Sequence, residues 1–481
     1  MQIQTPDWVK QAVFYQIFPD RFARTQRQPL PPAMQVPLEA WDAPPTLDGY
    51  KGGDLWGVAE NLDYLQDLGI NAIYFTPIFQ SASNHRYHTH DYYQIDPLLG
   101  GNNAFQDLLA AAHQRDIKVV LDGVFNHASR GFFFFNDILE NGPTSPWLDW
   151  FKVEGWPLSA YDGAKPANYE GWYDNRALPE FNHDNSQARE YIMQIAEYWL
   201  RQGIDGWRLD VPFDVKAEGF WQEFRQRVKA INPDAYIVGE IWTDARQWLD
   251  GTQFDGVMNY LFTGPVLAFT AKERVVMSLV EKPAYFPYPA LDAQGYAERI
   301  EALLGLYSWE IQLTQLNLLS SHDIARAITV MGDDQRSFEL AVLLQMTFPG
   351  APSIYYGDEV GLAGAHDPDC RRSFPNKAVW NQRLLTLHQE LIALRHRHPA
   401  LCTGTYQTVA AVNDLYGFAR SDDKETLIVL VNTADQSDRI TLSGLTEKVT
   451  VLWGEAEISV ETQQVSLLGR SGVVLDVRDE A

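Results

Sequence analysis

Charged side chains lie inside short apolar runs of this sequence, where they need partners. The run GWRLDV (206–211) carries Arg208 and Asp210 two positions apart. In a β-strand both would point to the same side, because side chains alternate with a period of two. Burying a guanidinium and a carboxylate together is costly unless they satisfy each other and a further group. The pair therefore predicts a strand that ends in a functional site.

Three other apolar runs carry polar residues at their ends in the same manner. They are LDGVFNH (121–127) with Asp122, Asn126 and His127, VGEIW (238–242) with Glu240, and LLSSHD (318–323) with His322 and Asp323. A single residue of this kind after a strand is usually part of a turn or a helix cap. Four runs with the same feature favour one shared site, because the C-terminal ends of parallel strands meet at one face of a barrel.

Three of these carboxylates, Asp210, Glu240 and Asp323, are typical of glycosyl chemistry. No cysteine cluster and no HExxH motif accompanies them in the sequence, which disfavours a metal hydrolase. In a glycosidase, one carboxylate is the nucleophile or base and a second, protonated carboxyl is the acid. The two lie about 5–5.5 Å apart when configuration is retained. We expect Arg208 to keep Asp210 ionised, and burial with nearby negative charge to raise the pKa of Glu240.

Eight β-type runs separated by amphipathic stretches are predicted to position these residues. The runs cover residues 12–18, 71–78, 118–124, 206–211, 236–242, 256–262, 317–323 and 352–359. Stretches such as AREYIMQIAEYWLRQG (188–203) between them have the periodicity of helices with one apolar face. Buried strands that alternate with helices predict an α/β fold, a (β/α)8 TIM barrel.

The third and fourth runs begin almost 90 residues apart, and this excess predicts an inserted lobe. The extra segment, 128–184, is rich in Phe, Trp, Tyr, Gly and Pro, and it leaves the barrel on the active-site face. After about residue 403, alternating runs such as TLIVLVNT (426–433) predict an antiparallel β-sandwich. The expected domains are the barrel (1–127 and 185–402), the lobe (128–184) and the C-terminal β-sandwich domain (403–481).

Composition excludes several classes of protein. The 481-residue chain is 46% hydrophobic but has no run of about 18 apolar residues that could span a bilayer. A net charge of −25 argues against nucleic acid and anionic membranes as partners. The start, MQIQTPDWVKQAVFYQIF, lacks the pattern of a secretory signal, and two cysteines make no disulfide framework. We therefore expect a cytoplasmic protein.

Together the motifs resemble the α-amylase superfamily, glycoside hydrolase family 13, over essentially the whole chain. The family's signature segments read DGVFNH, GWRLDV, GEIW and SSHD here. YQIFPDRF (15–22), GGDLWGV (52–58) and LPEFN (178–182) are most similar to the neopullulanase, cyclomaltodextrinase and maltogenic amylase group, especially its cyanobacterial glycogen-debranching members. The resemblance implies α-glucan and maltooligosaccharide substrates.

The resemblance also implies roles for individual residues. Asp210 is expected to be the nucleophile, Glu240 the acid/base, and Asp323 the carboxylate that holds the 2- and 3-hydroxyls of the sugar. Tyr87 is expected to stack on the ring of the cleaved sugar. The full set expected to bind substrate is Asn84, His85, Tyr87, Asp122, His127, Arg208, Phe213, Asp214, Trp242, His322, Asp367 and Arg371.

Three departures from the group limit what is carried over. The first barrel strand is predicted near residue 12, so we do not expect the group's N-terminal β-domain or its usual dimer. We expect a monomer or a weak oligomer instead. RFARTQRQPLPP (21–32) lacks the Asn/Asp cluster that, with the Gly53–Asp54 pair, binds calcium in many members, so neither a metal nor a cofactor is expected. VPFDV (211–215) and Thr243 alter the acceptor side.

We expect a retaining α-glycosidase that hydrolyses α-1,4 and α-1,6 bonds of maltooligosaccharides, cyclodextrins and branched α-glucans. The alternative is a 4-α-glucanotransferase or transglycosylating maltogenic amylase, which shares the covalent intermediate but excludes water. An inactive binding protein is disfavoured, because all three carboxylates are present. For Trp242, Trp172 and Tyr173, sugar stacking and core packing remain equally open.

Overall fold

The computed structural model describes residues 3–27, 35–280 and 289–477, and its centre is an eight-stranded parallel sheet. The strands, in their order around the sheet, are β8 (Gly256–Val257), β7 (Tyr236–Gly239), β6 (Gly206–Leu209), β5 (Lys118–Gly123), β2 (Ala72–Phe75), β1 (Phe14–Ile17), β10 (Ala351–Tyr355) and β9 (Leu316–Leu318). A parallel bridge between Met258 and Leu316 joins the two end strands, so the sheet closes. The predicted TIM barrel is confirmed.

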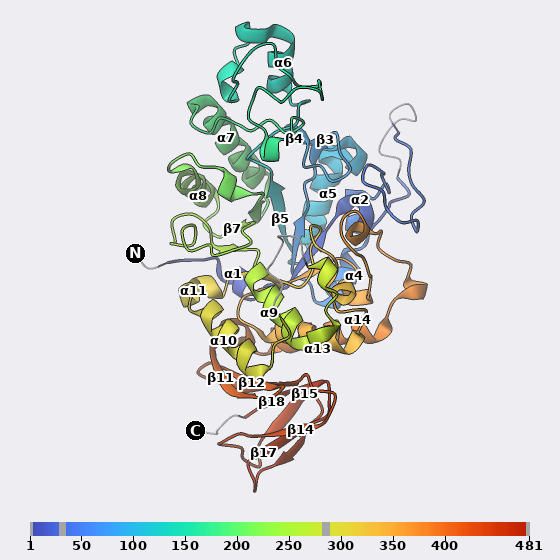
Figure 1. Cartoon of the computed structure of the whole chain (residues 1–481), viewed down its shortest axis with the longest axis vertical. Coiled ribbons are helices and arrows are strands. Elements are labelled where there is room, and N and C mark those ends of the chain that lie inside the picture. Colours follow the sequence, from blue (N-terminus) through green and yellow to red (C-terminus); the bar gives the residue numbers. More distant parts are fainter. Residues whose placement is uncertain (1–2, 28–34, 281–288, 478–481) are drawn as a thin grey trace.

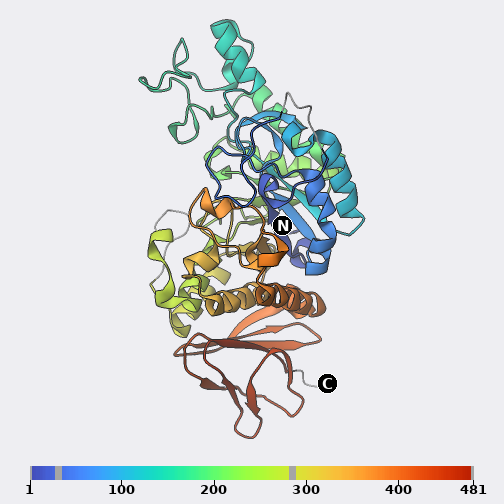
Figure 2. The same cartoon turned by 90° about the vertical axis from the view of Figure 1, so that its right-hand side faces the viewer.

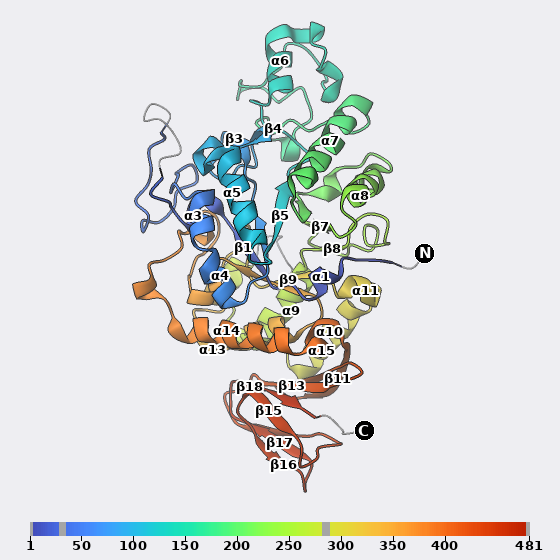
Figure 3. The ribbon, with the colours of Figure 1, turned by 180° about the vertical axis from the view of Figure 1, so that it is seen from behind.

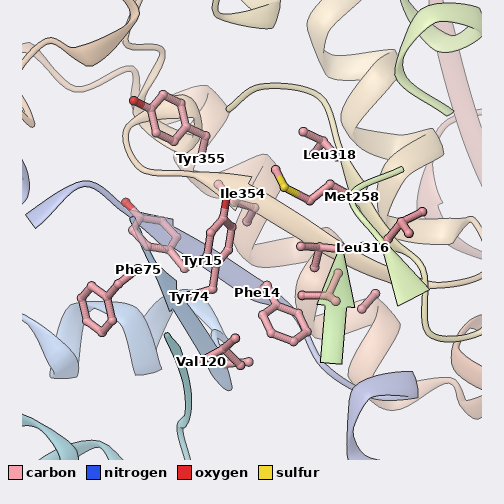
Figure 4. Close-up of a cluster of buried hydrophobic side chains, with 14 of the residues drawn as sticks. Phe14, Tyr15, Tyr74, Phe75, Val120, Met258, Leu316, Leu318, Ile354 and Tyr355 are labelled. Carbon is pink, nitrogen blue, oxygen red and sulfur yellow. The ribbon is translucent and has the colours of Figure 1, made fainter. Parts of the chain in front are cut away.

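The barrel interior is filled by side chains from strands far apart in the sequence (Figure 4). Phe14, Tyr74, Val120, Leu316 and Leu318 are at most 2% exposed. Strands buried on both faces need such unbroken apolar sequence, because helices cover their outer side. The polar residues that end these strands are therefore exceptions to a strict pattern.

Helices surround the barrel (Figures 1 and 3). They are α1 (Asp7–Lys10), α2 (Pro19–Phe22), α3 (Leu55–Glu60), α4 (Leu62–Leu68), α5 (Gly101–His113), α7 (Ser186–Gln202), α8 (Phe220–Ile231), α9 (Tyr260–Thr270), α10 (Ala293–Leu304), α11 (Trp309–Gln312), α12 (Ala327–Val330), α13 (Gln335–Thr347), α14 (Gln382–Arg397) and α15 (Pro399–Thr403). In the described residues, no helix is long and apolar enough to cross a membrane.

One predicted strand is wrong over most of its length. The run GVMNYLF (256–262) forms only the two-residue strand β8, and α9 begins at Tyr260. Almost every side chain of α9 is buried, so the helix has no polar face to reveal its period. A short apolar run cannot be assigned to strand or helix by periodicity alone.

The segment between β5 and α7 forms a lobe at one end of the molecule (Figure 1). It contains β-bridges, α6 (Phe133–Asn141), and the 3-10 segments η3 (Gly142–Thr144), η4 (Leu148–Trp150) and η5 (Trp172–Asp174). Phe132 and Phe135 are fully buried and pack edge-on against Phe151. These rings make the lobe's own core, and we keep 128–184 as its proposed limits.

A two-stranded ribbon, β3 (Phe79–Ser81) and β4 (Thr89–Ile95), follows β2.

The C-terminal strands form two antiparallel sheets at the other end of the molecule (Figures 1 and 2). The five-stranded sheet contains β11 (Thr405–Val412), β12 (Leu415–Ser421), β13 (Thr426–Asn432), β18 (Ser471–Asp476) and β15 (Thr450–Gly454), and the three-stranded sheet contains β14 (Asp438–Thr441), β17 (Gln464–Leu467) and β16 (Glu457–Ser459). A separate apolar core lies within this β-domain. Helices α13 and α14 separate it from the barrel (Figure 3).

Candidate active site

Glycines fix the path of the chain into β6. Helix α7 ends at Gly203, whose φ of 106° is a left-handed conformation that glycine adopts without strain. Gly206 opens β6 so close to its neighbour that a Cβ there would lie 2.3 Å from the carbonyl oxygen of Tyr236. The strand therefore packs tightly against β7, and this brings the ends of the two strands together.

Arg208 connects three carboxylates from three adjacent strands. Its Nη1 donates to both oxygens of Asp122, at 3.0 and 2.9 Å, and to Oδ1 of Asp210 at 2.9 Å. Its Nη2 lies 3.0 Å from Oε2 of Glu240. All four side chains are buried. One guanidinium thus offsets part of the cost of burying three acidic groups, which explains the pair seen in the sequence.

The acidic groups of this cluster have raised pKa values. Burial raises the pKa of Asp210 to about 6, although the guanidinium of Arg208 opposes this shift. Burial raises the pKa of Glu240 further, to about 8, with the charge of Asp210 adding to the effect. At neutral pH the geometry therefore favours an ionised Asp210 beside a protonated Glu240, the division of roles that a retaining glycosidase requires.

Glu240 is held from two sides. Its Oε2 accepts the backbone N–H of Val211 at 3.1 Å, and its Oε1 accepts the indole N–H of Trp242 at 3.2 Å. The Trp242 ring stacks on Tyr260 with centroids 3.6 Å apart. Since Oε2 also faces Arg208, the acidic proton of Glu240 is best placed on Oε1. Trp242 thus contacts the predicted acid directly, a role the sequence did not reveal.

Tyr87 and His322 link the cluster to Asp323. The Tyr87 hydroxyl donates to Oδ2 of Asp122 at 2.9 Å and lies 2.5 Å from Nε2 of His322. The same Nε2 is 3.1 Å from Oδ2 of Asp323. On the far side of the ring, Nδ1 of His322 is 2.8 Å from Nε2 of Gln16. Gln16 was missed, and its only signal was a polar residue within the apolar run AVFYQIF.

Arg371 lies beside Asp323, and Asp367 pairs with Arg371. Arg371 donates from Nε to the backbone oxygen of His322 at 2.8 Å, and its Nη2 lies 3.5 Å from Asp323. Nη1 of Arg371 pairs with Asp367 at 3.2 Å. Burial raises the pKa of Asp323, and the charge of Arg371 opposes this. Arg371 therefore balances Asp323 much as Arg208 balances Asp210.

His85 and Asn84, the expected neighbours of Tyr87, make different contacts. His85 packs against the Tyr87 ring with centroids 5.6 Å apart. Asn84 is buried, and its amide nitrogen donates to the backbone oxygens of Leu47 and Gly49. These bonds fix the loop, so contact between Asn84 and substrate stays a prediction.

The lobe contributes Trp172 to the site. Trp172 stacks on His127 with centroids 5.4 Å apart, and its indole nitrogen donates to Asp214 at 3.2 Å. The next residue, Tyr173, is 77% exposed and has a φ of 48°. Trp172 therefore joins the lobe to the segment that follows Asp210, whereas Tyr173 is no part of a core. His127 is buried, and burial lowers its pKa to about 3.

Phe213 lies beside Asp214 on the short segment η6 (Pro212–Asp214). It is half-buried and packs at the edge of the main core. The structure thus places Phe213 three residues beyond Asp210, at the barrel face that carries the other candidates.

Both carboxylate oxygens of Asp54, a residue of the segment compared with the family's calcium site, accept backbone hydrogen bonds. Asp54 caps α3 through Gly57 at 2.8 Å and accepts the backbone N–H of Thr25 at 3.0 Å. Within the described ranges, no group of three His, Cys, Asp or Glu could hold a metal. Residues 28–34, which include part of RFARTQRQPLPP, lie outside those ranges.

A closed α/β barrel that gathers acidic residues at its strand ends around one arginine defines the class of barrel glycosidases. The model of the α-amylase catalytic domain matches residues 16–399, and the chain belongs to this family. A solved debranching enzyme from Nostoc punctiforme is 64% identical, with a TM-score of 0.92 over 99% of this chain and 100% of that one.

Two curated relatives are similar over most of this chain and are longer than it. A cyclomaltodextrinase from a Bacillus species is 42% identical over 89% of this chain and 74% of its own length. Neopullulanase 2 from Thermoactinomyces vulgaris is 43% identical over 91% of this chain and 72% of its own. These similarities agree with the group inferred from the motifs.

Proposed function

We propose that the protein is a retaining α-glycosidase that hydrolyses both α-1,4 and α-1,6 bonds of maltooligosaccharides, cyclodextrins and branched α-glucans. One observation carries the proposal: Arg208 holds Asp210 and Glu240 together at the ends of neighbouring strands, with the lower pKa on Asp210. The names of its relatives, a debranching enzyme, a cyclomaltodextrinase and a neopullulanase, support the two bond types.

The reaction follows from the two protonation states. Asp210 attacks the anomeric carbon while Glu240 gives its proton to the leaving oxygen, and a covalent glycosyl-enzyme forms. Glu240, now ionised, removes a proton from a water molecule as the water oxygen bonds to the anomeric carbon and the bond from that carbon to Asp210 breaks. Two inversions leave the product in the α-configuration. Asp323 and Arg371 are proposed to hold sugar hydroxyls, and Tyr87 to face the sugar ring.

Replacing the two carboxyl groups tests this assignment. Asp210→Asn should stop the covalent step and Glu240→Gln should remove the proton donor, so turnover should fall by about two to four orders of magnitude in each. NMR of fresh product should show the α-anomer first. More than about a tenth of wild-type turnover in either variant, or β-anomer appearing first, would overturn the assignment.

The chemistry of transfer and hydrolysis diverges only at the second step. A 4-α-glucanotransferase would pass the glycosyl group to a sugar instead of water, and its products from maltotriose would include longer chains. The relatives' names favour hydrolysis. Pullulan digestion separates the bond types, since panose, isopanose, maltotriose and maltose each report a different cleavage.

We propose that the protein is cytoplasmic, and its two cysteines support this. Cys370 and Cys402 are buried free thiols, as expected in a reducing cytoplasm. The monomer or weak oligomer inferred from the sequence stays a proposal, and light scattering across a concentration series would test it.

A further inference from the structure

Gln16 is a buried amide at the start of a hydrogen-bonded chain that ends at the nucleophile. It lies in β1, is 1% exposed, and faces Nδ1 of His322, which follows β9, two strands along the sheet, and lies 306 positions away in the sequence. Its neighbours in the strand, Tyr15 and Ile17, are fully buried. A polar side chain in such a strand is costly unless it is bonded, so its partner is informative.

The groups around His322 determine which ring nitrogen carries the proton. The Tyr87 hydroxyl gives its proton to Asp122, so its oxygen has to accept from Nε2 of His322. The Asp323 carboxylate, 3.1 Å from the same nitrogen, also accepts. Both contacts require a proton on Nε2.

The other nitrogen of His322 is then an acceptor. Burial lowers the pKa of His322 well below its usual range, and the charges of Arg371 and Arg208 add to this effect, so the ring is neutral. A neutral imidazole with its proton on Nε2 has a lone pair on Nδ1. The amide N–H of Gln16 satisfies that lone pair at 2.8 Å. The contacts of Nε2 and the contact of Nδ1 thus favour the same tautomer of His322, with the proton on Nε2.

We propose that Gln16 is a positioning residue that holds His322 in its Nε2–H tautomer and thereby orients Tyr87 and Asp323 toward the sugar. The chain of donors runs in one direction, from Gln16 through His322 and Tyr87 to Asp122, which Arg208 joins to Asp210. The effect on catalysis rests on the proposed glycosidase function, whereas the tautomer does not.

Two substitutions separate the role of the donor from that of the side-chain volume. Gln16→Met keeps a similar length and removes the N–H, which leaves Nδ1 of His322 buried without its donor. Gln16→Glu replaces the donor with an acceptor, which pulls a proton onto Nδ1 and favours a charged ring. A charged His322 beside the site opposes the positive charge that develops on the sugar in the transition state.

Gln345→Met is a matched control within the same barrel. Gln345 lies on α13, is 2% exposed, and donates to the backbone oxygens of Asn317 and Ser353 at 3.0 and 2.9 Å. Its loss removes buried amide bonds of the same kind, far from His322 in the bonding network. Stability should fall in this variant without a change at the site.

The test combines nitrogen NMR of protein labelled with ¹⁵N-histidine and the pH dependence of maltohexaose cleavage. We expect a lone pair on Nδ1 of His322 in the wild type, loss of its hydrogen bond in Gln16→Met, and a protonated Nδ1 in Gln16→Glu. We expect kcat to fall about tenfold in Gln16→Met with KM little changed, because the sugar contacts strengthen in the transition state. In Gln16→Glu, the acidic limb of kcat/KM should move to higher pH by about one unit.

Each result bears on the proposal. A wild-type Nδ1 that carries a proton overturns it, whatever the substrate proves to be. So do Gln16 variants that keep wild-type pH profiles and kcat, or a Gln345→Met variant that reproduces the same kinetic changes. A wild type inactive on α-glucans overturns the proposed function instead, while the histidine spectra still decide the tautomer. Melting curves confirm that each variant is folded.

Discussion

Val211 donates its backbone N–H to Oε2 of Glu240 at 3.1 Å while its own φ is +34°. A β-branched residue in this left-handed region is strained, by about 1–3 kcal/mol. The strained residue immediately follows Asp210, so a single turn connects the predicted nucleophile to the predicted acid. The surrounding fold compensates for this strain, and the left-handed conformation directs the backbone N–H of Val211 toward Glu240.

Replacing Val211 with Ala should therefore cost less stability than the same change elsewhere. Val211 and Val238 are both buried, but Val238 lies in the extended strand β7. Each substitution removes two methyl groups and so loses packing contacts. Only Val211→Ala also relieves the crowding of a β-branched side chain on a left-handed backbone. We expect its loss of stability to be smaller by about 1 kcal/mol, as measured by thermal melting.

Activity distinguishes the backbone contact from the side chain. Val211→Ala retains the N–H and should keep kcat within about threefold of the wild type, a small change on the scale of catalytic contacts. Equal destabilisation by Val211→Ala and Val238→Ala would show that the left-handed conformation is not strained.

The pH dependence of kcat/KM should be a bell. Asp210 has to be ionised, so activity should rise as the pH passes its pKa of about 6. Glu240 has to be protonated, so activity should fall as the pH passes its pKa of about 8. Because the carboxyl groups interact, the limbs report apparent values of the cluster. Initial rates at subsaturating maltohexaose from pH 4 to 10 check this.

The Glu240→Gln variant provides the control for the basic limb. With a maltosyl fluoride, whose leaving group needs no proton, formation of the glycosyl-enzyme should no longer fall above pH 8 in the variant. A wild-type rate that keeps rising beyond about pH 9 would contradict the assignment of Glu240 as the acid.

Pattern alone located most of the barrel and its charged centre. Arg208 and Asp210 were recognisable because two charges at strand spacing inside an apolar run must share one environment. Gln16 was not, because one polar residue in a buried strand has many explanations, and its partner His322 lies 306 positions away. Likewise, periodicity carries no information on the backbone of Val211, or on the start of the uniformly buried helix α9.

Removal of metal should leave the protein unchanged. The oxygens of Asp54 are committed to Gly57 and Thr25, and a calcium ion needs about six to eight oxygen ligands. Exhaustive chelation should change neither turnover nor melting temperature, because only a bound ion stabilises the folded state by linkage. Restoration of a lost activity or a shift of several degrees on adding Ca²⁺ back would reveal a site involving other residues.

The choice between bonds should depend on Phe213. This residue has an apolar, half-buried side chain next to Asp214, which Trp172 holds by a hydrogen bond, and it is predicted to lie at the acceptor side. A hydrogen-bonding side chain would fit one orientation of a glucose hydroxyl and penalise others, because a buried polar group without a partner is costly. An apolar face carries no such penalty. The acceptor glucose of an α-1,6 bond is turned and displaced relative to that of an α-1,4 bond, so both should be accepted by the wild type.

Phe213→Asn should therefore shift the ratio of cleavage toward α-1,4 bonds, by about tenfold, the effect of roughly one mismatched hydrogen bond. The measurement is the initial rate on a branched maltooligosaccharide and on its linear counterpart, with products separated by chromatography. Phe133→Asn is the control, since Phe133 lies on the lobe and is 55% exposed, and its ratio should not change. An unchanged ratio of α-1,4 to α-1,6 cleavage in Phe213→Asn would show that Phe213 does not determine which bond is cleaved. If the wild type leaves the α-1,6 bond intact, the proposed debranching activity is wrong. The site would then select the α-1,4 acceptor by contacts other than Phe213.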